Sequence, residues 1–559
     1  MVLMMQDDAD LKRFITTKLE QMKARRALVD QRWIKCCQFV SHRTSDIDGR
    51  VPERPLFSGI PKDALAVTQR GFAGYLLSPN LRWFRYRTKG RRFEKSDTLY
   101  GANDWLEEVE DIQYTIYSNS RFYATSYEAI EDVLTIGTSY EMVTDDMENG
   151  RIVYDCYSPF ECYIAEDGQR RVDTFFREYT LTADEAYAKW GDELPSEIVQ
   201  KVKGNQGSVR CSFVHAIFPR RQAEVADVRI PASDSKPYAS VHYCASVSKV
   251  FRTSGYDDFP LAVHRFHLAP GSPYGESLVS KNLELVMEND NIHRKYSTAV
   301  AKQVDPPTIV PPSLQGRANL NAGAILYADV NSDGKPMSVQ TSIDITALAK
   351  EKADSDQMVY RVFFADLFNI LMRQERERTA YEVSELKGES LILLSQLIGN
   401  MQEEKLNPLV LRTLAIMVRN GLVPEAPDEL KEAWREGRVN VELEGPLIQT
   451  MKQYHQTSGL TQGLSWMSSW AQIFPQSIVN VDGDEGMRQG LTSYGFPQSI
   501  IREQADVRKI KEQQAMAERQ AQMQQNALAQ SQVYRNMGVD AEDIAVLQQG
   551  NENMRNGGV

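Results

Sequence analysis

The fold of this 559-residue chain is decided by residues 373–383, which read Arg-Gln-Glu-Arg-Glu-Arg-Thr-Ala-Tyr-Glu-Val. The first six residues form a charged break between two strongly apolar segments. Thr379 and Glu382 then form a Thr-x-x-Glu capping box, whose side chains accept hydrogen bonds from free backbone N–H groups at a helix start. A new helix is therefore predicted to begin at Thr379, which makes the charged break a loop between two helices.

The helix that follows this cap is predicted to be unusually long. Apolar residues recur at helical spacing from Val383 to Met417, before Gly421 ends the pattern. Roughly 40 residues at 1.5 Å each would run about 60 Å, which is too long for a compact monomeric core and needs neighbours. Pro408 lies inside this helix and removes a backbone donor, so a kink is predicted around Leu406.

Two further helices, Glu276–Gln303 and Thr346–Met372, bracket a proline-rich segment on the N-terminal side of the break. The prolines of Asp305-Pro306-Pro307 can neither continue a helix nor pair inside a sheet, so an exposed edge or extended arm is predicted. Residues 329–334 match the first half of an EF-hand calcium loop, but its twelfth position is Gln340 instead of a glutamate. The flanking residues resemble strands, so a β-hairpin turn is predicted there.

The first 270 residues predict an α+β body. Residues 8–40 and 63–77 have helical spacing, whereas from Ser139 the apolar period changes to two, as in strands. Residues 83–87, Trp-Phe-Arg-Tyr-Arg, alternate aromatic and basic side chains. Such a segment can stack on nucleic-acid bases, but a half-buried strand explains it as well and is the favoured interpretation.

The composition excludes some function classes. Acidic residues outnumber basic ones 76 to 64, which gives a net charge of −12. This balance argues against tight wrapping of duplex DNA, which needs a basic footprint, but not against DNA that passes by. No apolar run approaches the roughly 18 residues of a membrane span, and no secretory signal is present. We therefore expect a soluble protein without a membrane partner.

Motifs of catalysis or metal binding are missing from the sequence. There is no Gly-rich phosphate loop, HExxH or GxSxG motif, and the six cysteines show no CxxC pair. His264 and His267 are three residues apart on a predicted strand, where they face opposite sides and cannot share a metal. Cys156 and Cys162 lie across a turn without a histidine pair at zinc-finger spacing. We expect no catalytic residues, no metal, no cofactor and reduced thiols.

The C-terminal third is predicted to be mainly helical. After Pro424 the pattern indicates a short helix and a strand, and helix returns from Pro446 to Phe474. Residues 502–535 are rich in Gln, Ala and Met and largely uninterrupted, which predicts a polar helix that packs weakly against copies of itself.

Over most of its length the chain resembles the head-to-tail connecting (portal) proteins of short-tailed phages. Each motif that carries this resemblance is weak alone, and it is their order and spacing together that are specific. The motifs are Leu76-Leu77-Ser78-Pro79 with Trp83-Phe84, the helix from Phe122 to Gly137-Thr138, Val172-Asp173-Thr174 with Arg177-Glu178, residues 270–277 (Pro-Gly-Ser-Pro-Tyr-Gly-Glu-Ser), Val304-Asp305-Pro306-Pro307, and residues 378–383 (Arg-Thr-Ala-Tyr-Glu-Val).

The resemblance implies an α+β portal fold. This fold has an α+β wing, a helical stem, a small β clip, a long kinked wing helix and a helical C-terminal crown or barrel. The implied boundaries are 1–275 for the wing, 276–303 for stem helix 1, 304–345 for the clip, 346–372 for stem helix 2, 373–380 for the tunnel loop, 381–465 for the long helix with the rest of the wing, and 466–559 for the crown or barrel.

The implied function is that of a portal, or head-tail connector, in the virion. It would be a ring of twelve identical subunits at one capsid vertex, assembled in the host cytoplasm, through which double-stranded DNA is packaged and ejected. The partners would be the terminase motor, then the tail adaptor, with the major capsid and scaffolding proteins. The alternative is another non-enzymatic virion assembly or scaffolding protein, which does not predict the order of clip, stem and loop.

Two groups of residues are the candidate sites. Arg373, Arg376 and Arg378 would face DNA in the tunnel loop and act as a local brake, whereas Asp329, Asn331, Asp333 and Lys335 would dock partners at the clip. The interleaved glutamates, Glu375 and Glu377, offer a second interpretation, in which they pair with the arginines and the loop is simply solvated.

Overall fold

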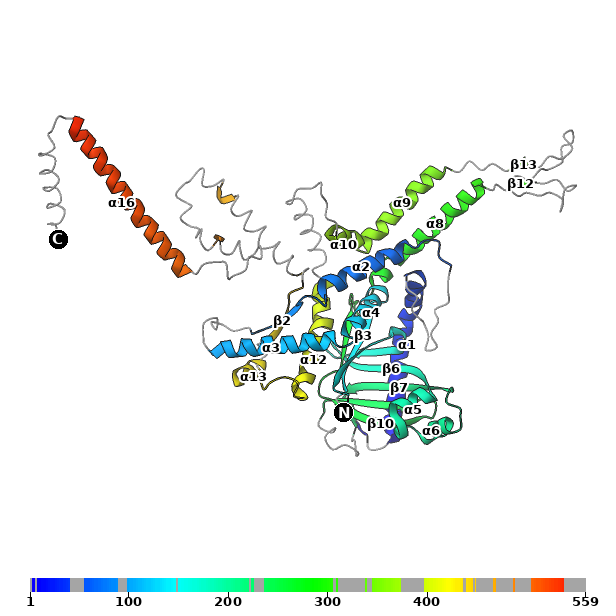
Figure 1. The fold of residues 1–559 in the computed structure, drawn as a ribbon. Helices are drawn as coiled ribbons and strands as arrows, with labels where there is room; N and C mark the ends of the chain where they lie inside the picture. The colour runs from blue at the N-terminus through cyan, green and yellow to red at the C-terminus, as the bar shows by residue number, and fades with distance from the viewer. Residues whose placement is uncertain are drawn as a thin grey trace, which may run out of the picture. The chain divides into compact units, whose positions relative to one another are not determined.

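In the computed structural model the chain forms two compact units, Met1–Met451 and Lys452–Val559. Figure 1 shows the fold. The structure describes residues 3–5, 8–40, 55–88, 98–146, 149–220, 223–225, 236–304, 308–309, 337–338, 344–372, 397–435, 439–445, 448, 466–468, 486–487 and 504–536.

A five-stranded antiparallel sheet lies under the long N-terminal helix α1 (Asp8–Val40) (Figure 1). Apolar residues of α1 pack on one face of the sheet, as Ile15 does near Phe176 and Val214. Helices α5 (Ala183–Trp190) and α6 (Ser196–Lys203) also pack on this sheet. They share a buried hydrophobic cluster around Trp190 with its strands. In spatial order the strands are β10 (Lys249–Tyr256), β9 (Tyr238–Cys244), β7 (Arg210–Pro219), β6 (Val172–Thr182) and β5 (Cys162–Glu166).

A second, three-stranded antiparallel sheet carries the largest core. Its order is β11 (Leu261–Arg265), β3 (Thr138–Asp146), β4 (Arg151–Tyr157). Its strands pack near α2 (Ile60–Leu76), α3 (Thr98–Ser118) and α4 (Phe122–Thr135). Stacked aromatic rings fill this core, with 3.9 Å between the ring centroids of Tyr117 and Phe122 and 6.0 Å between those of Trp83 and Phe122. The smaller elements are β1 (Leu3–Met5), β8 (Ala223–Val225) and the 3-10 turns η1 (Pro159–Glu161) and η2 (Gly191–Glu193).

The aromatic–basic segment is a half-buried strand, as predicted. Strand β2 (Phe84–Thr88) pairs antiparallel with β14 (Val439–Leu443), which follows the short helix α13 (Asp428–Arg435). Phe84 and Tyr86 are buried on one face, whereas Arg85 and Arg87 point outward and form ion pairs with glutamates of β14 and the residue after it. The aromatic rings are therefore core residues and are not available to stack on bases.

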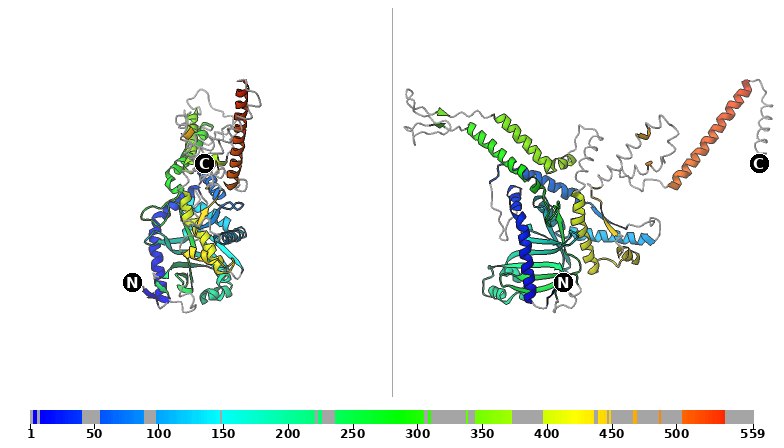
Figure 2. Two further views of the ribbon diagram at one scale, coloured as in Figure 1. Left: turned by 90° about the vertical axis from the view of Figure 1, so that its left-hand side faces the viewer. Right: turned by 180° about the vertical axis from the view of Figure 1, so that it is seen from behind.

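A helical hairpin leaves this body and ends in a strand pair (Figures 1 and 2). Helices α8 (Leu283–Val304) and α9 (Ile345–Val362) lie side by side and antiparallel, with hydrogen bonds between them. Beyond them β12 (Thr308–Ile309) pairs antiparallel with β13 (Met337–Ser338). We call α8 and α9 the stem hairpin.

The structure corrects the predicted length of both stem helices. The first helix does not run unbroken from Glu276, because Ser277 caps the single-turn helix α7 (Leu278–Lys281) and a turn at Asn282 precedes α8. The second helix is interrupted after Val362, and α10 (Ala365–Met372) continues the chain.

The interruption between α9 and α10 has a physical cause in the body. Phe364 adopts a φ of +61°, which is unfavourable for a bulky side chain. The Phe363 carbonyl accepts a 2.6 Å hydrogen bond from the buried Thr68 hydroxyl of α2, and Phe363 and Phe368 are both fully buried. Packing against α2 therefore overrides the helical pattern that the sequence predicts.

The long helix is described only from Leu397 onward. It contains a π-helical segment, η5 (Gln402–Leu406), followed directly by α12 (Asn407–Arg419). The helix is thus distorted around Leu406, where the kink is predicted, just before Pro408. The distortion is a π-helical turn, which is wider than a turn of α-helix. The start at Thr379 lies outside the described residues.

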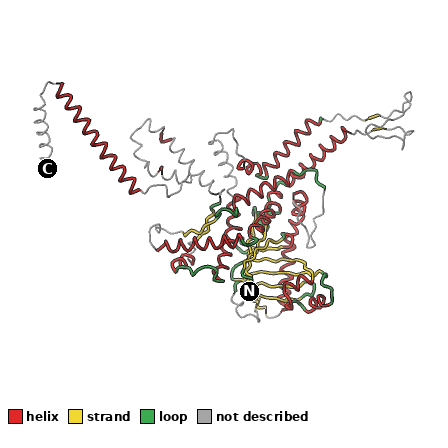
Figure 3. Tube along the Cα trace, viewed as in Figure 1, coloured by secondary structure: helices red, strands yellow, loops and turns green. Residues whose placement is uncertain are grey.

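The second unit contains the predicted polar helix, α16 (Gln504–Asn536) (Figure 3). Most of its described side chains are exposed, including Met516, Met523 and Leu528. Its packing against copies of itself stays a prediction.

Gly71→Ala tests the packing of α10 on α2. A Cβ at Gly71 would lie 2.2 Å from the Phe368 ring, which is fully buried, so we expect a loss of about 1–3 kcal/mol of stability. Gly74→Ala in the same helix is the matched control, because nothing lies within 4 Å of its Cβ position, and it should be neutral or slightly stabilising. Thermal unfolding of both variants measures the difference, and equal unfolding temperatures would contradict this packing.

Candidate functional site

Buried polar side chains hold the two helices of the stem hairpin in one register. The Asn289 amide of α8 donates to Ser355 Oγ at 3.0 Å and to Asp356 Oδ1 at 2.8 Å, both on α9. One turn along, His293 Nε2 lies 2.7 Å from the same Asp356 oxygen. Because these groups are directional and largely removed from water, sliding one helix along the other would leave them unpaired.

The base of the stem hairpin is tied to the segment that precedes α2. The Asp290 carboxylate accepts the backbone N–H groups of Phe57 at 2.7 Å and Ser58 at 3.1 Å. The Ser58 hydroxyl donates to Asn289 Oδ1 at 2.6 Å, and Ser58, Asn289 and Asp290 are all buried. The stem hairpin is therefore fixed to the body as well as internally.

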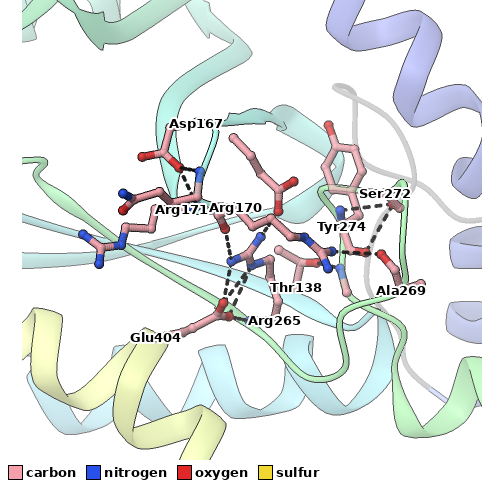
Figure 4. A network of polar contacts seen from close by, with 12 residues as sticks. Thr138, Asp167, Arg170, Arg171, Arg265, Ala269, Ser272, Tyr274 and Glu404 are labelled. Carbon is pink, nitrogen blue, oxygen red and sulfur yellow. Dashed lines mark hydrogen bonds and ion pairs between the residues drawn. The ribbon is translucent and has the colours of Figure 1, made fainter.

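A second polar network fixes the long helix to the body (Figure 4). The buried Arg265 guanidinium, at the end of β11, lies between two carboxylates and forms ion pairs with Glu166 and Glu404. Its Nε donates to Glu404 at 3.0 Å, its backbone N–H donates to the same carboxylate at 2.7 Å, and its Nη2 donates to the Arg170 carbonyl at 3.0 Å. One arginine thus joins β11, the β5–β6 turn and the long helix.

The same network reaches the turn that precedes the stem hairpin. In Figure 4 Thr138, at the start of β3, lies close to Tyr274, and its hydroxyl accepts the Gly275 N–H at 3.0 Å. Gly137 has a φ of +103°, and a Cβ there would lie 2.4 Å from the Gly275 carbonyl oxygen. The 270–277 motif is thus a close backbone crossing that only glycines allow.

Lys405, the residue after Glu404, forms a fully buried ion pair with Glu141 of β3. Glu141 also accepts a 2.9 Å hydrogen bond from the Ser126 hydroxyl of α4. Both Glu404 and Lys405 belong to the π-helical segment η5, whose widened turn lets consecutive side chains reach adjacent strands of one sheet.

His264, next to Arg265 on β11, is buried beside these ion pairs but carries no charge. Burial, followed by the nearby Lys405 and Arg265 charges, lowers its pKa to about 3. The histidine is therefore neutral near pH 7.

The sequence-predicted site residues are not placed by the structure. Arg373, Arg376 and Arg378, with Glu375 and Glu377, lie outside the described residues, and so do Asp329, Asn331, Asp333 and Lys335. The structure places only their neighbours. Helix α10 ends at Met372, and the β12–β13 pair brackets residues 310–336.

Sequence reasoning missed the anchoring residues, although a signal for some of them exists. Lys405 and Arg412 occur at helical spacing with Met401 and Leu409, in the apolar stripe of the long helix. Charged residues inside a buried stripe need partners of opposite charge, and the sequence gives no indication that these are the buried Glu141 for Lys405 and the exposed Asp258 for Arg412.

The described part of the chain offers no cluster of His, Cys, Asp and Glu that could hold a metal. All six cysteines lie in that part and none is in a disulfide. Burial raises the pKa of the Cys36 thiol to about 12, which keeps it protonated and unreactive. Among the described helices, none has the length and hydropathy to span a bilayer.

The stem hairpin and its strand pair project from an α+β body, and sequence comparisons give the class of protein to which this chain belongs. The family model for the bacteriophage head to tail connecting protein matches residues 12–501, and the chain belongs to this family. It is 25% identical over 522 residues to the portal protein of Salmonella phage epsilon15, covering 90% of this chain and 91% of the relative. It is 26% identical over 469 residues, 82% of each chain, to the probable portal protein of Bordetella phage BPP-1.

The predicted function class is thereby confirmed. The chain is a phage portal, or head-tail connector, protein, a non-enzymatic structural component at the portal vertex of the virion. Family membership implies the portal fold and an oligomeric ring within the capsid.

Replacement of Lys405 by Met tests the buried anchor of the long helix. It leaves the Glu141 carboxylate buried without its counter-charge, so we expect a loss of about 3–5 kcal/mol. Combining Lys405→Met with Glu141→Gln removes both charges and should recover most of the loss. Lys431→Met, which removes an exposed ion pair with Glu425, is the control and should unfold like the wild type. Glu141→Gln alone completes the cycle. Denaturant unfolding compares the five proteins, and additive losses in the double variant would contradict a direct pair.

Proposed function

We propose that twelve copies of this chain form a ring whose stem hairpins surround a channel for double-stranded DNA. DNA would enter the capsid through this channel during packaging and leave through it during ejection. The observation that carries the proposal is the stem hairpin, which is locked internally by Asn289, His293 and Asp356 and fixed to the body through Asp290. Such a rigid hairpin suits the wall of a channel that must keep its width under load.

The charge of the chain supports passage of DNA without tight binding. Each copy carries a net charge of −12, so a largely acidic lumen would repel the phosphate backbone and let the duplex slide. In this proposal the tunnel loop, residues 373–380, is the one basic region of the otherwise acidic lumen. Its arginines would contact phosphates and read no bases.

The clip, residues 304–345, would dock the terminase motor during packaging and the tail adaptor afterwards. Pairing of β12 with β13 supports this, because it brings the two ends of the segment together at the far end of the stem hairpin. Asp329, Asn331, Asp333 and Lys335 are the proposed contact residues. The body, residues 1–275 with residues of 381–465, would form the wing that meets the major capsid and scaffolding proteins, and residues 466–559 would form the crown or barrel.

Changing Arg373, Arg376 and Arg378 together to alanine tests the brake. Rings should form normally, but the fraction of capsids that retain their packaged DNA should fall by roughly tenfold or more. The reason is that phosphate contacts supply most of the non-specific affinity for DNA. Restriction analysis of packaged genomes measures this, with light scattering as the measure of ring assembly. The matched control changes all three to lysine and should retain DNA. Normal retention by the alanine variant would favour a solvated loop in which Glu375 and Glu377 pair with the arginines.

A clip variant tests the docking site. Residues 312–335 are replaced by a short Gly/Ser linker, which leaves β12 and β13 intact. We expect rings of the wild-type diameter that no longer bind the motor or the adaptor in a pull-down assay. A second variant with alanine at Asp329, Asn331, Asp333 and Lys335 should weaken binding in the same direction. Wild-type binding by the linker variant would place the docking site elsewhere.

A further inference from the structure

A cleft of about 620 Å³ runs along strand β4, which is an edge strand of the three-stranded sheet. Six consecutive residues, 150–155, line one of its walls. The end of α3, the α3–α4 turn and the segment after α12 line the other wall, through Thr115, Ile116, Asn119, Ser120, Arg121 and Leu422. The volume is within the range of ligand-binding sites. We call this the edge cleft.

Hydrogen bonds of the middle strand, β3, show which backbone groups of β4 face the edge cleft. The Val143 N–H donates to the Pro260 carbonyl at 3.0 Å, on the side of β11. Successive residues of an antiparallel strand bond to opposite neighbours, so Thr144 bonds to β4, where it lies opposite Val153. Val153 therefore turns its N–H and C=O toward β3, and the residues before and after it turn theirs away from β3.

Those two residues, Ile152 and Tyr154, present unpaired backbone groups to the edge cleft. Their outward N–H and C=O groups have no hydrogen-bond partner in the described part of the chain. Their side chains are buried, at 4% and 3% exposure, so the core holds the strand while its outer edge stays open. Two donors and two acceptors at the spacing of a β ladder are matched by the backbone of an extended polypeptide.

One side of the edge cleft is apolar. The Tyr154 ring lies 5.8 Å from that of Tyr117 in α3, and its hydroxyl lies 3.0 Å from the Thr413 hydroxyl in α12. Both helices therefore pack on the Tyr154 face of β4. On this side Ile116 is partly buried and Leu422 is 40% exposed, and both line the edge cleft. Apolar side chains of an added strand are accommodated there.

The other face of β4 is basic at its start. The Arg151 side chain lies on this face, because it alternates with Ile152, and it is 67% exposed. Its ion pair with Asp146, at 2.9 Å, leaves it open to a further acid. Asp155 lies on the same face, four residues and about 13 Å along the strand, so an acid of the added strand belongs at the Arg151 end.

We infer that the edge cleft docks an extended segment of another virion protein, which adds a fourth, antiparallel strand to this sheet. Both existing strand pairs of the sheet are antiparallel. Opposite residues of an antiparallel pair share a face, so the segment places apolar residues opposite Ile152 and Tyr154 and an acid opposite Arg151. The source of the segment rests on the proposed function, in which residues 1–275 belong to the wing that meets capsid and scaffolding proteins.

A synthetic peptide tests strand addition on the full-length protein. The fluorescently labelled probe is Val-Thr-Val-Thr-Val-Glu, whose last three residues lie opposite residues 153 to 151. N-methylation of its third and fifth residues, both valines, removes the two donors to Ile152 and Tyr154 and should weaken binding by about tenfold or more. N-methylation of the two threonines is the matched control, because their N–H groups point away from β4, and it should leave the affinity unchanged. Anisotropy titration measures all three peptides.

Charge exchange tests the register. Arg151→Glu should weaken binding of the probe by about tenfold, because like charges then face each other. A second probe with lysine in place of glutamate should bind this variant better than it binds the wild type. Arg25→Glu, at an exposed position of α1 that does not line the edge cleft, is the control and should bind both probes like the wild type.

Two results of these titrations would overturn strand addition. One is that no binding of the first probe is detected at roughly millimolar peptide. The other is that both N-methylated peptides bind equally.

Hydrogen exchange tests the source of the segment. Mass spectrometry of fragments from residues 151–157 should show amide exchange that slows by about tenfold or more between free rings and assembled capsids. Protection already present in free rings would make a neighbouring copy the occupant, and equal exchange in both samples would show an empty edge. Either result overturns the inference and leaves the proposed ring intact. Absence of rings would instead overturn the proposed function, while the peptide titrations would still test the edge cleft.

Discussion

Two consecutive charged residues, Glu404 and Lys405, constrain how the body is assembled. Removal of an ion from water costs several kcal/mol even after relaxation, so each needs a partner of opposite charge in close contact. Glu404 finds it in Arg265 and Lys405 in Glu141, on adjacent strands of one sheet. A regular α-helix would turn these side chains about 100° apart, and the π-helical segment is where the helix adapts to both demands. The position of the long helix on the body follows from this pair.

The constraint spreads outward from there. Arg265 also holds Glu166 and the Arg170 carbonyl, and Thr138 of the same sheet holds the backbone crossing of Gly137 and Gly275. That crossing leads within a few residues into α7 and the stem hairpin. Contacts in one small region therefore join the long helix, the five-stranded sheet and the stem hairpin. Force applied to the stem hairpin would be transmitted to the core of the body, not to a flexible linker.

Local signals in the sequence predict much of this fold. The helical spacing of residues 8–40 and 63–77 predicts the observed helices α1 and α2. Failures occur where tertiary contacts outweigh local pattern. Leu28 fits the apolar stripe of α1 yet is 86% exposed, and the stem helices are broken at Asn282 and Phe364. The partners of Lys405 and Arg265 lie far away in sequence, so no periodicity could predict them. The end of the first stem helix could be predicted because residues 305–307, Asp-Pro-Pro, cannot continue a helix, and α8 ends at Val304.

The pairing of β2 with β14 has a consequence for biosynthesis. Residues 84–88 find their partner strand only in residues 439–443, so the largest core cannot close until most of the chain has left the ribosome. Contacts of such sequence separation form slowly, and Phe84 and Tyr86 remain exposed meanwhile. Nascent chains of this protein are therefore expected to depend on chaperones, and completion of the chain sets the earliest moment at which a subunit becomes competent to join a ring.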